Sequence, residues 1–304
     1  MVARRTLLAA LCAGAGLGLA PAVGLGQRLG AGAAARTDRQ AAFDAACARL
    51  ERTYGGRLGV AMLDLGRDGA PLAHRGSERF ALCSTFKLLA AGFVLARVDA
   101  GQERLQRRMP YARADLIVHS PVTAPHADDR AGMTLQALCE AAVTLSDNTA
   151  ANLLLDSFGG PAALTGYLRT LGDTVTRLDR REPDLNRVEP GDPRDTTSPL
   201  AMLASLRRLV MGDALSVSSR ARLAAWLRDC RTGTRQLRAG VPADWGAGDK
   251  TGAGRRQAND VAIFWPPGRE PVLVAAYYES PEARIPEGRG DAVLSAVGRQ
   301  VAAH

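Results

Sequence analysis

The sequence STFKLLAAGFVLARV, residues 84–98, is typical of a helix, since it contains no proline and carries its apolar residues at helical spacing. Further helical patterns surround it, and alternating or apolar strand patterns stand nearer both ends of the chain. We expect helices over residues 38–54, 84–98, 135–142, 149–158, 162–171, 199–210, 219–227 and 291–302. We expect strands over residues 58–65, 72–80, 245–250, 261–265 and 272–278.

This order of strands, helices and strands predicts an α+β fold. We expect a mostly antiparallel β-sheet that is flanked by the terminal helices, with an all-α domain inserted between its strands. The α/β domain takes residues 36–82 plus 229–304, and the inserted helical domain takes residues 83–228.

The first 35 residues have the pattern of a signal peptide and not of a folded domain. Arg4 and Arg5 precede an apolar stretch over residues 7–19, and small-residue cleavage sites follow at residues 20–22 and 33–35. The adjacent arginines fit a twin-arginine signal as well as an ordinary one. We therefore expect export to the bacterial periplasm by either route, and no membrane span in the mature chain.

The net charge and the cysteines narrow the class of protein further. The net charge is +8, yet the basic residues are scattered and form no nucleic-acid-binding run. Of 39 basic residues only two are lysines, Lys87 and Lys250, which leaves 37 arginines. A lysine differs from an arginine because burial can lower its pKa and turn it into a base. Behind the leader stand Cys47, Cys83, Cys139 and Cys230, which we expect to be buried free thiols.

Three short motifs carry candidate chemistry. Ser84 and Lys87 are three residues apart on one helical face, so the amine can activate the hydroxyl, although SxxK alone is a weak signal. The tripeptide at residues 146–148, Ser-Asp-Asn, lies between two helices and can offer a hydroxyl and a carboxamide to a cleft, but taken alone it favours a helix N-cap, with Ser146 or Asp147 capping the helix that follows. The triad at residues 250–252, Lys-Thr-Gly, ends a predicted strand.

These three motifs, in this order, are the known set of class A β-lactamases and penicillin-binding proteins. From about Asp38 to the C-terminus the sequence resembles the class A serine β-lactamase family. Glu182 and Asn186 fit that family's ExxLN motif, which lies on an Ω-loop at residues 177–195 here. The resemblance implies that an Arg180–Asp195 pair ties the neck of this loop, and that the active site lies between the two domains.

The resemblance also implies a role for each matching residue. Ser84 would be the nucleophile, Lys87 and Glu182 would share the base role, and Ser146 would pass a proton to the ring nitrogen with help from Lys250. Substrate binding would fall to Asn148, Asn186, Thr251, Gly252, Ala253 and His119, with the N–H groups of Ser84 and Ala253 as the oxyanion hole. The implied reaction is hydrolysis of penicillins and cephalosporins, which confers antibiotic resistance. It requires no metal and no cofactor, and the expected enzyme is a monomer with small β-lactams as its partners.

The chain departs from parts of the family. Two known disulfides of relatives cannot form, since their second cysteines are replaced by Gly254 and Ala91. Arg235 and Arg289 lie in segments that often supply an extra arginine for the substrate carboxylate, but we assign neither to that position. The rival interpretations are a DD-peptidase and a β-lactam sensor domain. Glu182 and Asn186 argue against the peptidase, because a peptidase needs no fast hydrolytic water.

Overall fold

A computed structural model describes residues 23–67, 70–189 and 191–304. The chain divides into two units between Asp38 and Arg39, and the sheet and all candidate site residues belong to the second. Most of the predicted leader lies outside the described residues. Helix α1 (Val23–Tyr54) begins earlier than the predicted start at Asp38. No proline interrupts residues 23–37, although four of them are glycines, which form helices poorly.

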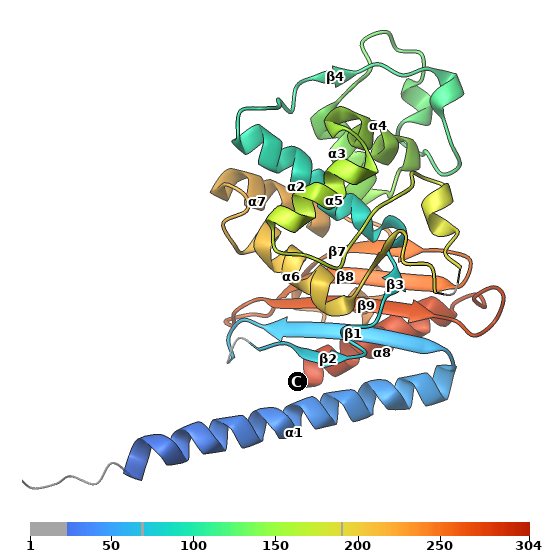
Figure 1. Ribbon diagram of the computed structural model, residues 1–304. Helices are drawn as coiled ribbons and strands as arrows, with labels where there is room; N and C mark the ends of the chain where they lie inside the picture. Colours follow the sequence, from blue (N-terminus) through green and yellow to red (C-terminus); the bar gives the residue numbers. More distant parts are fainter. Residues whose placement is uncertain (1–22, 68–69, 190) are drawn as a thin grey trace, which may run out of the picture. The chain divides into compact units, whose positions relative to one another are not determined.

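The centre of the second unit is a five-stranded antiparallel sheet in the order β2-β1-β9-β8-β7 (Figure 1). Its strands are β1 (Arg57–Asp64), β2 (Leu72–His74), β7 (Gly246–Ala253), β8 (Gln257–Trp265) and β9 (Val272–Glu279). Strands β1, β8 and β9 are buried along nearly their whole length. They therefore have apolar residues on both faces, as expected where helices cover both sides of a sheet.

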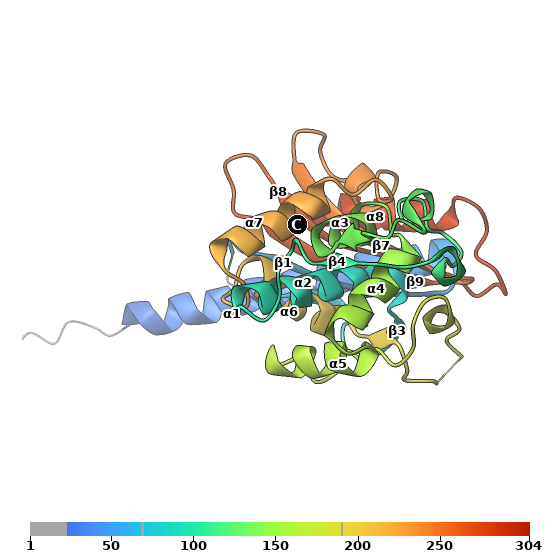
Figure 2. The same cartoon turned by 90° about the horizontal axis from the view of Figure 1, so that it is seen from above.

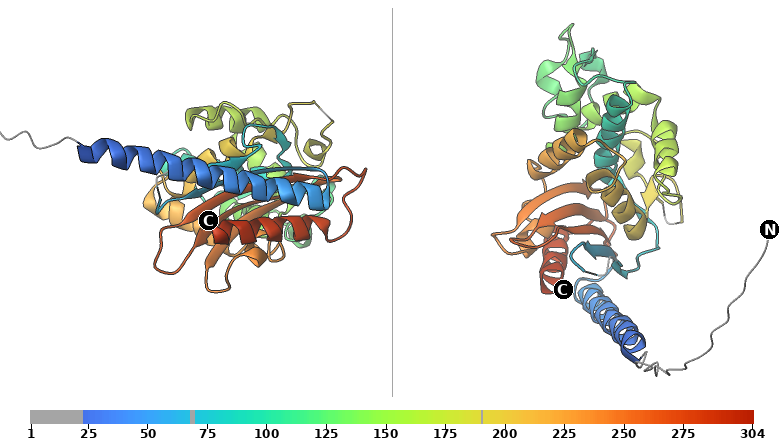
Figure 3. Two further views of the ribbon diagram at one scale, coloured as in Figure 1. Left: turned by 90° about the horizontal axis from the view of Figure 1, so that it is seen from below. Right: turned by 90° about the vertical axis from the view of Figure 1, so that its left-hand side faces the viewer.

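Helices lie on both faces of this sheet (Figures 1 and 2). On one face, α8 (Arg289–Ala303) and the part of α1 after Asp38 run beside each other (Figure 3). They enclose a core that includes Phe43, Tyr278 and Val297. The other face carries α2 (Phe86–Asp99), α6 (Pro199–Val210) and α7 (Val217–Arg228), with α3 (Leu135–Thr144), α4 (Asn148–Phe158) and α5 (Pro161–Thr170) packed beyond them. This is the predicted α+β fold.

The strand predicted over residues 72–80 is confirmed only over Leu72–His74 and is wrong beyond them. The structure splits it into β2, which pairs with β1, and β3 (Phe80–Ala81), which pairs with β6 (Thr196–Thr197). The chain turns away from the sheet at Arg75, whose φ is 46°. Strand β3 thus places residues 80–85, which contain Ser84 and are called the nucleophile segment below, against the end of the predicted Ω-loop.

Two other elements have ends that differ from the predicted ones, and both ends lie at a motif. The helix expected from Ser84 begins at Phe86, after a 3₁₀ turn over Cys83–Thr85. Strand β7 continues past Lys250 to Ala253, so the Lys-Thr-Gly triad lies inside the strand and not at its end. The remaining strands, β4 (Arg108–Met109) and β5 (Met133–Thr134), form a short hairpin in the helical part. Among the described residues, no helix combines the length and the hydropathy that a membrane crossing requires.

Candidate active site

Ser84 stands on the 3₁₀ turn that precedes α2, and Lys87 lies one turn along. The Lys87 Nζ donates to Ser84 Oγ at 2.9 Å, as the spacing of the two residues predicts. The same amine donates to the Ser146 carbonyl at 2.8 Å and to Asn148 Oδ1 at 2.5 Å. Its side chain is fully buried and lies 3.1 Å from Glu182 Oε1.

Burial decides the charge state of this amine. It lowers the pKa of Lys87 from its usual value to about 8, because a charged ammonium is poorly solvated in the interior. The Glu182 carboxylate acts in the opposite direction and keeps the pKa from falling further. The neutral amine is therefore accessible near neutral pH.

Glu182 also contacts Ser84, and its Oε1, Lys87 Nζ and Ser84 Oγ form a triangle with sides of 2.9–3.2 Å. Its Oε1 accepts the Ser84 hydroxyl at 3.2 Å, and its Oε2 accepts Asn186 Nδ2 at 2.6 Å. The Oδ1 of Asn186 is buried and has no protein partner. A buried carbonyl oxygen of this kind is able to accept from a water molecule.

Asn152 is a site residue that sequence reasoning missed. From α4, its side chain bonds both backbone groups of Glu182: Nδ2 donates to the Glu182 carbonyl at 2.9 Å, and Oδ1 accepts the Glu182 N–H at 3.1 Å. This pair of bonds fixes the position of the Glu182 backbone. The only available signal was an amide four residues after Asn148, on the same face of the predicted helix.

The Ω-loop is closed at its neck by backbone and side-chain bonds. A bridge between Arg177 and Thr196 joins its ends. The buried Asp195 carboxylate accepts Arg180 Nε at 2.5 Å and also the backbone N–H groups of Asp179 and Arg180. In return the Asp179 carboxylate accepts the Asp195 N–H at 3.1 Å. The expected Arg180–Asp195 pair is present, and Asp179 adds a second aspartate that the sequence did not reveal.

The segment between α3 and α4 holds the Ser-Asp-Asn motif. Asp147 caps α4 by accepting the N–H of Ala150, as the capping interpretation predicted. Asn148 donates from its side chain to the Val118 carbonyl and from its backbone to the His119 carbonyl. The ring of His119 contacts the Leu145 carbonyl through Nε2 at 3.0 Å. These bonds attach the His119 segment to the Ser146–Asn148 motif.

Strand β7 carries the third group of candidate site residues, Lys250 to Ala253. The fully buried Lys250 donates to Ser146 Oγ at 3.0 Å, and burial lowers the pKa of its amine. Thr251 shares a 2.5 Å hydrogen bond with Thr232, another residue that sequence reasoning missed. A Cβ at Gly252 would lie 3.1 Å from the Leu82 carbonyl oxygen, so this position lets strand and nucleophile segment approach closely. Ala253 is exposed at the end of the strand.

Four residues in or beside the candidate site have strained backbone conformations. Cys83, His119, Ser146 and Asp195 all have φ between 44° and 62°, the left-handed region that non-glycine residues avoid. Such residues persist only where the surrounding structure holds them, and they are frequent at active sites.

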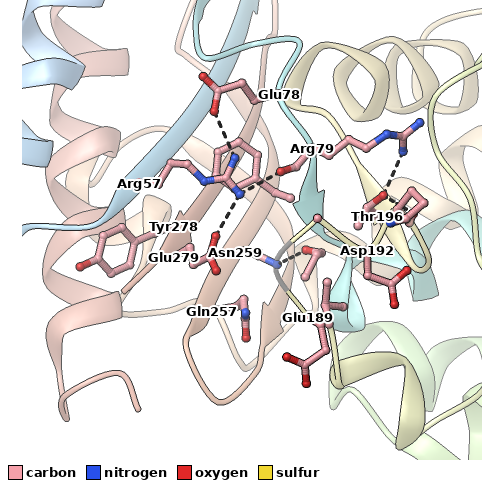
Figure 4. Close-up of a pocket in the computed structure, with 15 residues that line it drawn as sticks. Arg57, Glu78, Arg79, Glu189, Asp192, Thr196, Gln257, Asn259, Tyr278 and Glu279 are labelled. Atoms are coloured by element: carbon pink, nitrogen blue, oxygen red, sulfur yellow. Dashed lines mark hydrogen bonds and ion pairs between the residues drawn. The ribbon is translucent and has the colours of Figure 1, made fainter. Parts of the chain in front are cut away.

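A cavity of about 480 Å³ lies next to this cluster but is separate from it (Figure 4). It is bounded by the second half of the Ω-loop and by strand ends near Arg57 and Glu279. Arg57 bonds Glu78 and Glu279, so its charge is already paired. None of the predicted site residues lines the cavity.

The structure also bears on the two candidate arginines, on metal binding and on disulfides. Arg235 pairs through Nε with Asp291, and Arg289 pairs with Glu282. The described part of the chain contains no group of three or more residues suited to hold a metal ion. Its four cysteines, Cys47, Cys83, Cys139 and Cys230, are all free and buried.

A serine hydroxyl held between a buried amine and a carboxylate defines the class: an enzyme that works through a serine ester. The model of the beta-lactamase enzyme family matches residues 42–304. Beta-lactamase OXY-2 of Klebsiella oxytoca is 46% identical over 234 residues, 77% of this chain and 80% of the relative. Beta-lactamase L2 of Stenotrophomonas maltophilia is 44% identical over 290 residues, 93% of this chain and 94% of the relative.

A solved ancestral class A β-lactamase (GNCA) matches with a TM-score of 0.82 and 56% identity, and the match covers 85% of this chain and 98% of that one. The chain therefore belongs to the beta-lactamase enzyme family. It is a class A serine β-lactamase, a hydrolase of the β-lactam ring.

Proposed function

We propose that this enzyme opens the β-lactam ring of penicillins and cephalosporins by acylation of Ser84 and then hydrolyses the ester with a water activated by Glu182. The observation that carries the proposal is the position of Ser84 Oγ, 2.9 Å from Lys87 Nζ and 3.2 Å from Glu182 Oε1. Both candidate bases are therefore within reach of the same proton.

Acylation requires a proton to leave Ser84 and another to reach the ring nitrogen. Neutral Lys87, or Glu182, takes the first. Ser146 delivers the second and takes a proton in its place from Lys87, whose Nζ lies 3.4 Å from the Ser146 hydroxyl, while Lys250 Nζ lies 3.0 Å from it. Lys87 receives the Ser84 proton directly or through Glu182, 3.1 Å away, so Ser146 ends the step as a neutral hydroxyl. Ring opening thus forms the Ser84 ester and breaks the amide C–N bond, with the nitrogen leaving as a neutral amine.

Deacylation requires a water molecule on the ester. Glu182 accepts the water's proton as the water oxygen bonds the ester carbon, and it returns this proton to Ser84 Oγ as the ester C–O bond breaks. Asn186 orients the water through the buried Oδ1 that has no protein partner. The Asn152 bonds keep Glu182 in place during this step. A DD-peptidase would not need this arrangement, which supports hydrolysis over transfer.

Binding is assigned to the rest of the cluster. Lys250 and Thr251 face the substrate carboxylate, Asn148 binds the amide side chain, and His119 borders the entrance. The N–H groups of Ser84 and Ala253 stabilise the oxyanion, a contribution of about 10²–10³ in rate per donor. We further propose that the enzyme is exported to the periplasm, acts as a monomer on small β-lactams and binds no nucleic acid.

Ser84→Ala tests the nucleophile. Mass spectrometry after brief exposure to a slowly hydrolysed β-lactam should show one substrate mass added to the wild type and none to the variant. Turnover of a chromogenic cephalosporin should be sustained in the wild type and absent in Ser84→Ala. A stable adduct on another residue, or turnover by the variant, would contradict the proposed mechanism.

A further inference from the structure

A row of four residues crosses the sheet beneath the nucleophile segment. Gly59 of β1 pairs with Tyr277 of β9, Tyr277 pairs with Asn259 of β8, and Asn259 pairs with Gly252 of β7. Directly paired residues of neighbouring strands point to the same face. We call these four residues the cross-strand row.

The two glycines at the ends of the row let the segment lie directly on the sheet. A Cβ at Gly59 would lie 2.3 Å from the ring of Phe80, and one at Gly252 would lie 3.2 Å from the Cβ of Cys83. Larger residues would push the segment away. The segment before and around Ser84 is therefore in contact with the sheet at both ends of the row.

The two polar residues in the middle bond the segment itself. Asn259 Nδ2 donates to the carbonyls of Ala81 at 2.9 Å and Leu82 at 3.3 Å (Figure 4 shows the Asn259 side chain). Thr85 donates its hydroxyl proton to the Leu82 carbonyl at 2.7 Å. The Tyr277 hydroxyl, 3.3 Å from Thr85 Oγ1, is thus the donor in its contact with Thr85.

These groups are buried, and of the three only Asn259 borders the cavity in Figure 4. Asn259 is 1% exposed, and Tyr277 and Thr85 are fully buried. Removing the Asn259 amide would take away the side-chain donor of the buried Ala81 carbonyl, whereas the Leu82 carbonyl would still accept the Thr85 backbone N–H at 3.2 Å. The Leu82 N–H is also used, since it donates to the Asp195 carbonyl at 2.9 Å. The peptide groups on the N-terminal side of Cys83 are therefore fixed from the sheet and from the Ω-loop.

Cys83 needs this support because its φ of 44° is unfavourable for a residue with a side chain. Ser84 follows it immediately, so the conformation of Cys83 sets the direction of both the Ser84 N–H and its Oγ. We propose that Asn259 and Tyr277 are positioning residues that hold the Cys83–Thr85 turn in its strained form and thereby align the oxyanion hole with the nucleophile. This inference rests on the proposed role of Ser84.

The test compares variants that remove one donor each. Asn259→Leu removes the amide at similar volume, Thr85→Val removes the hydroxyl, and Thr85→Ser retains it. The acylation rate constant, measured by stopped flow per titrated active site, should fall on the order of 10- to 100-fold in Asn259→Leu and Thr85→Val. Thr85→Ser should restore most of the rate.

A second readout separates positioning from stability. Phenylboronic acid forms a tetrahedral adduct on the serine, with one oxygen in the oxyanion hole, so its affinity should fall by a similar factor in both weakened variants. The dissociation constant of the penicillin before acylation should change less than threefold or so, since Lys250 and Thr251 are untouched. Tyr278→Phe is the matched control. Its hydroxyl lies on the opposite face of β9 and contacts the Tyr54 carbonyl, so the rate and the boronate affinity should stay unchanged.

Variants that are less stable to heat but keep the wild-type acylation rate and boronate affinity would overturn the inference. If Asn259→Leu does not fold, Tyr277→Phe decides, since it removes a single hydroxyl and should lower the rate several-fold. Wild-type protein that gains no adduct on Ser84 would instead refute the proposed function, so the two failures are distinguishable.

Discussion

At the scale of single residues, the site depends on the burial of two amines in a chain that otherwise uses arginine. An arginine cannot lose its proton at physiological pH, whereas a buried lysine can. Lys87 is fully buried among acceptors, and its pKa falls to about 8. The rarity of lysine in the sequence thus marked both residues in advance. Their burial and partners required the structure.

The pKa of Lys87 gives a pH prediction. In Glu182→Gln only the amine remains as a base, and a base works in its neutral form. Acylation should therefore rise as the pH increases through the pKa of Lys87. Because the Glu182 carboxylate raises this pKa, its removal should place the midpoint below about 8. Single-turnover acylation between about pH 5 and 10 measures the midpoint. A profile without a rising limb would exclude Lys87 as the base.

Sequence reasoning found the residues with a chemical signature and missed those that position them. Ser84, Lys87, Glu182 and Lys250 belong to motifs, and the structure brings them into one cluster. Asn152 and Thr232 act through contacts between distant segments, which no local pattern encodes.

At the scale of elements, the Ω-loop depends on its neck. Asp195 is fully buried and accepts three hydrogen bonds, two of them from backbone N–H groups. The strand prediction failed close to this point, because β3 pairs with β6 across a long sequence separation. A local alternation at residues 72–80 cannot show that the chain leaves one sheet for another.

Asp195→Asn tests the neck. An amide replaces a carboxylate that holds Arg180 and two N–H groups, so the variant should lose about 3 kcal/mol of stability. Penicillin turnover should fall because Glu182 is less well held, and bulky cephalosporins should suffer less. Urea unfolding and steady-state kinetics measure the two effects.

The matched control is Asp184→Asn, which removes an exposed ion pair with Arg187 on the same loop. It should cost less than about 1 kcal/mol. Unchanged penicillin turnover in Asp195→Asn would remove the neck from the mechanism.

At the scale of the whole molecule, two hydrophobic cores hold the sheet between helices, and the four cysteines among the described residues are all free. One core lies between the sheet and the terminal helices, and the larger one joins the sheet to α2 and the helices around it. The alternation of strands and helices predicted this architecture, because each element needs an apolar partner face. The start of α1 was not predictable, since the residues before Asp38 include four glycines, which by their propensity argue against a helix there.

The cysteines give a prediction at this scale. Cys47, Cys83, Cys139 and Cys230 are buried and free, and burial raises the pKa of the Cys139 thiol well above its usual range. Protonated buried thiols are poorly reactive. Titration in denaturant without reductant should therefore give four thiols per mature chain, and titration of the folded protein almost none. A count of two or zero in denaturant would reveal a disulfide.

The central claim is that Glu182 drives hydrolysis of the Ser84 ester, and Glu182→Ala tests it most directly. Loss of a general base costs about 10²–10⁴ in the step that it serves. Stopped-flow mixing of this variant with a penicillin should show a burst near one equivalent, followed by almost no steady turnover, with the acyl-enzyme visible by mass spectrometry. A variant that forms no acyl-enzyme would show that acylation also depends on Glu182 and not on Lys87 alone, and steady turnover at the wild-type rate would contradict the account.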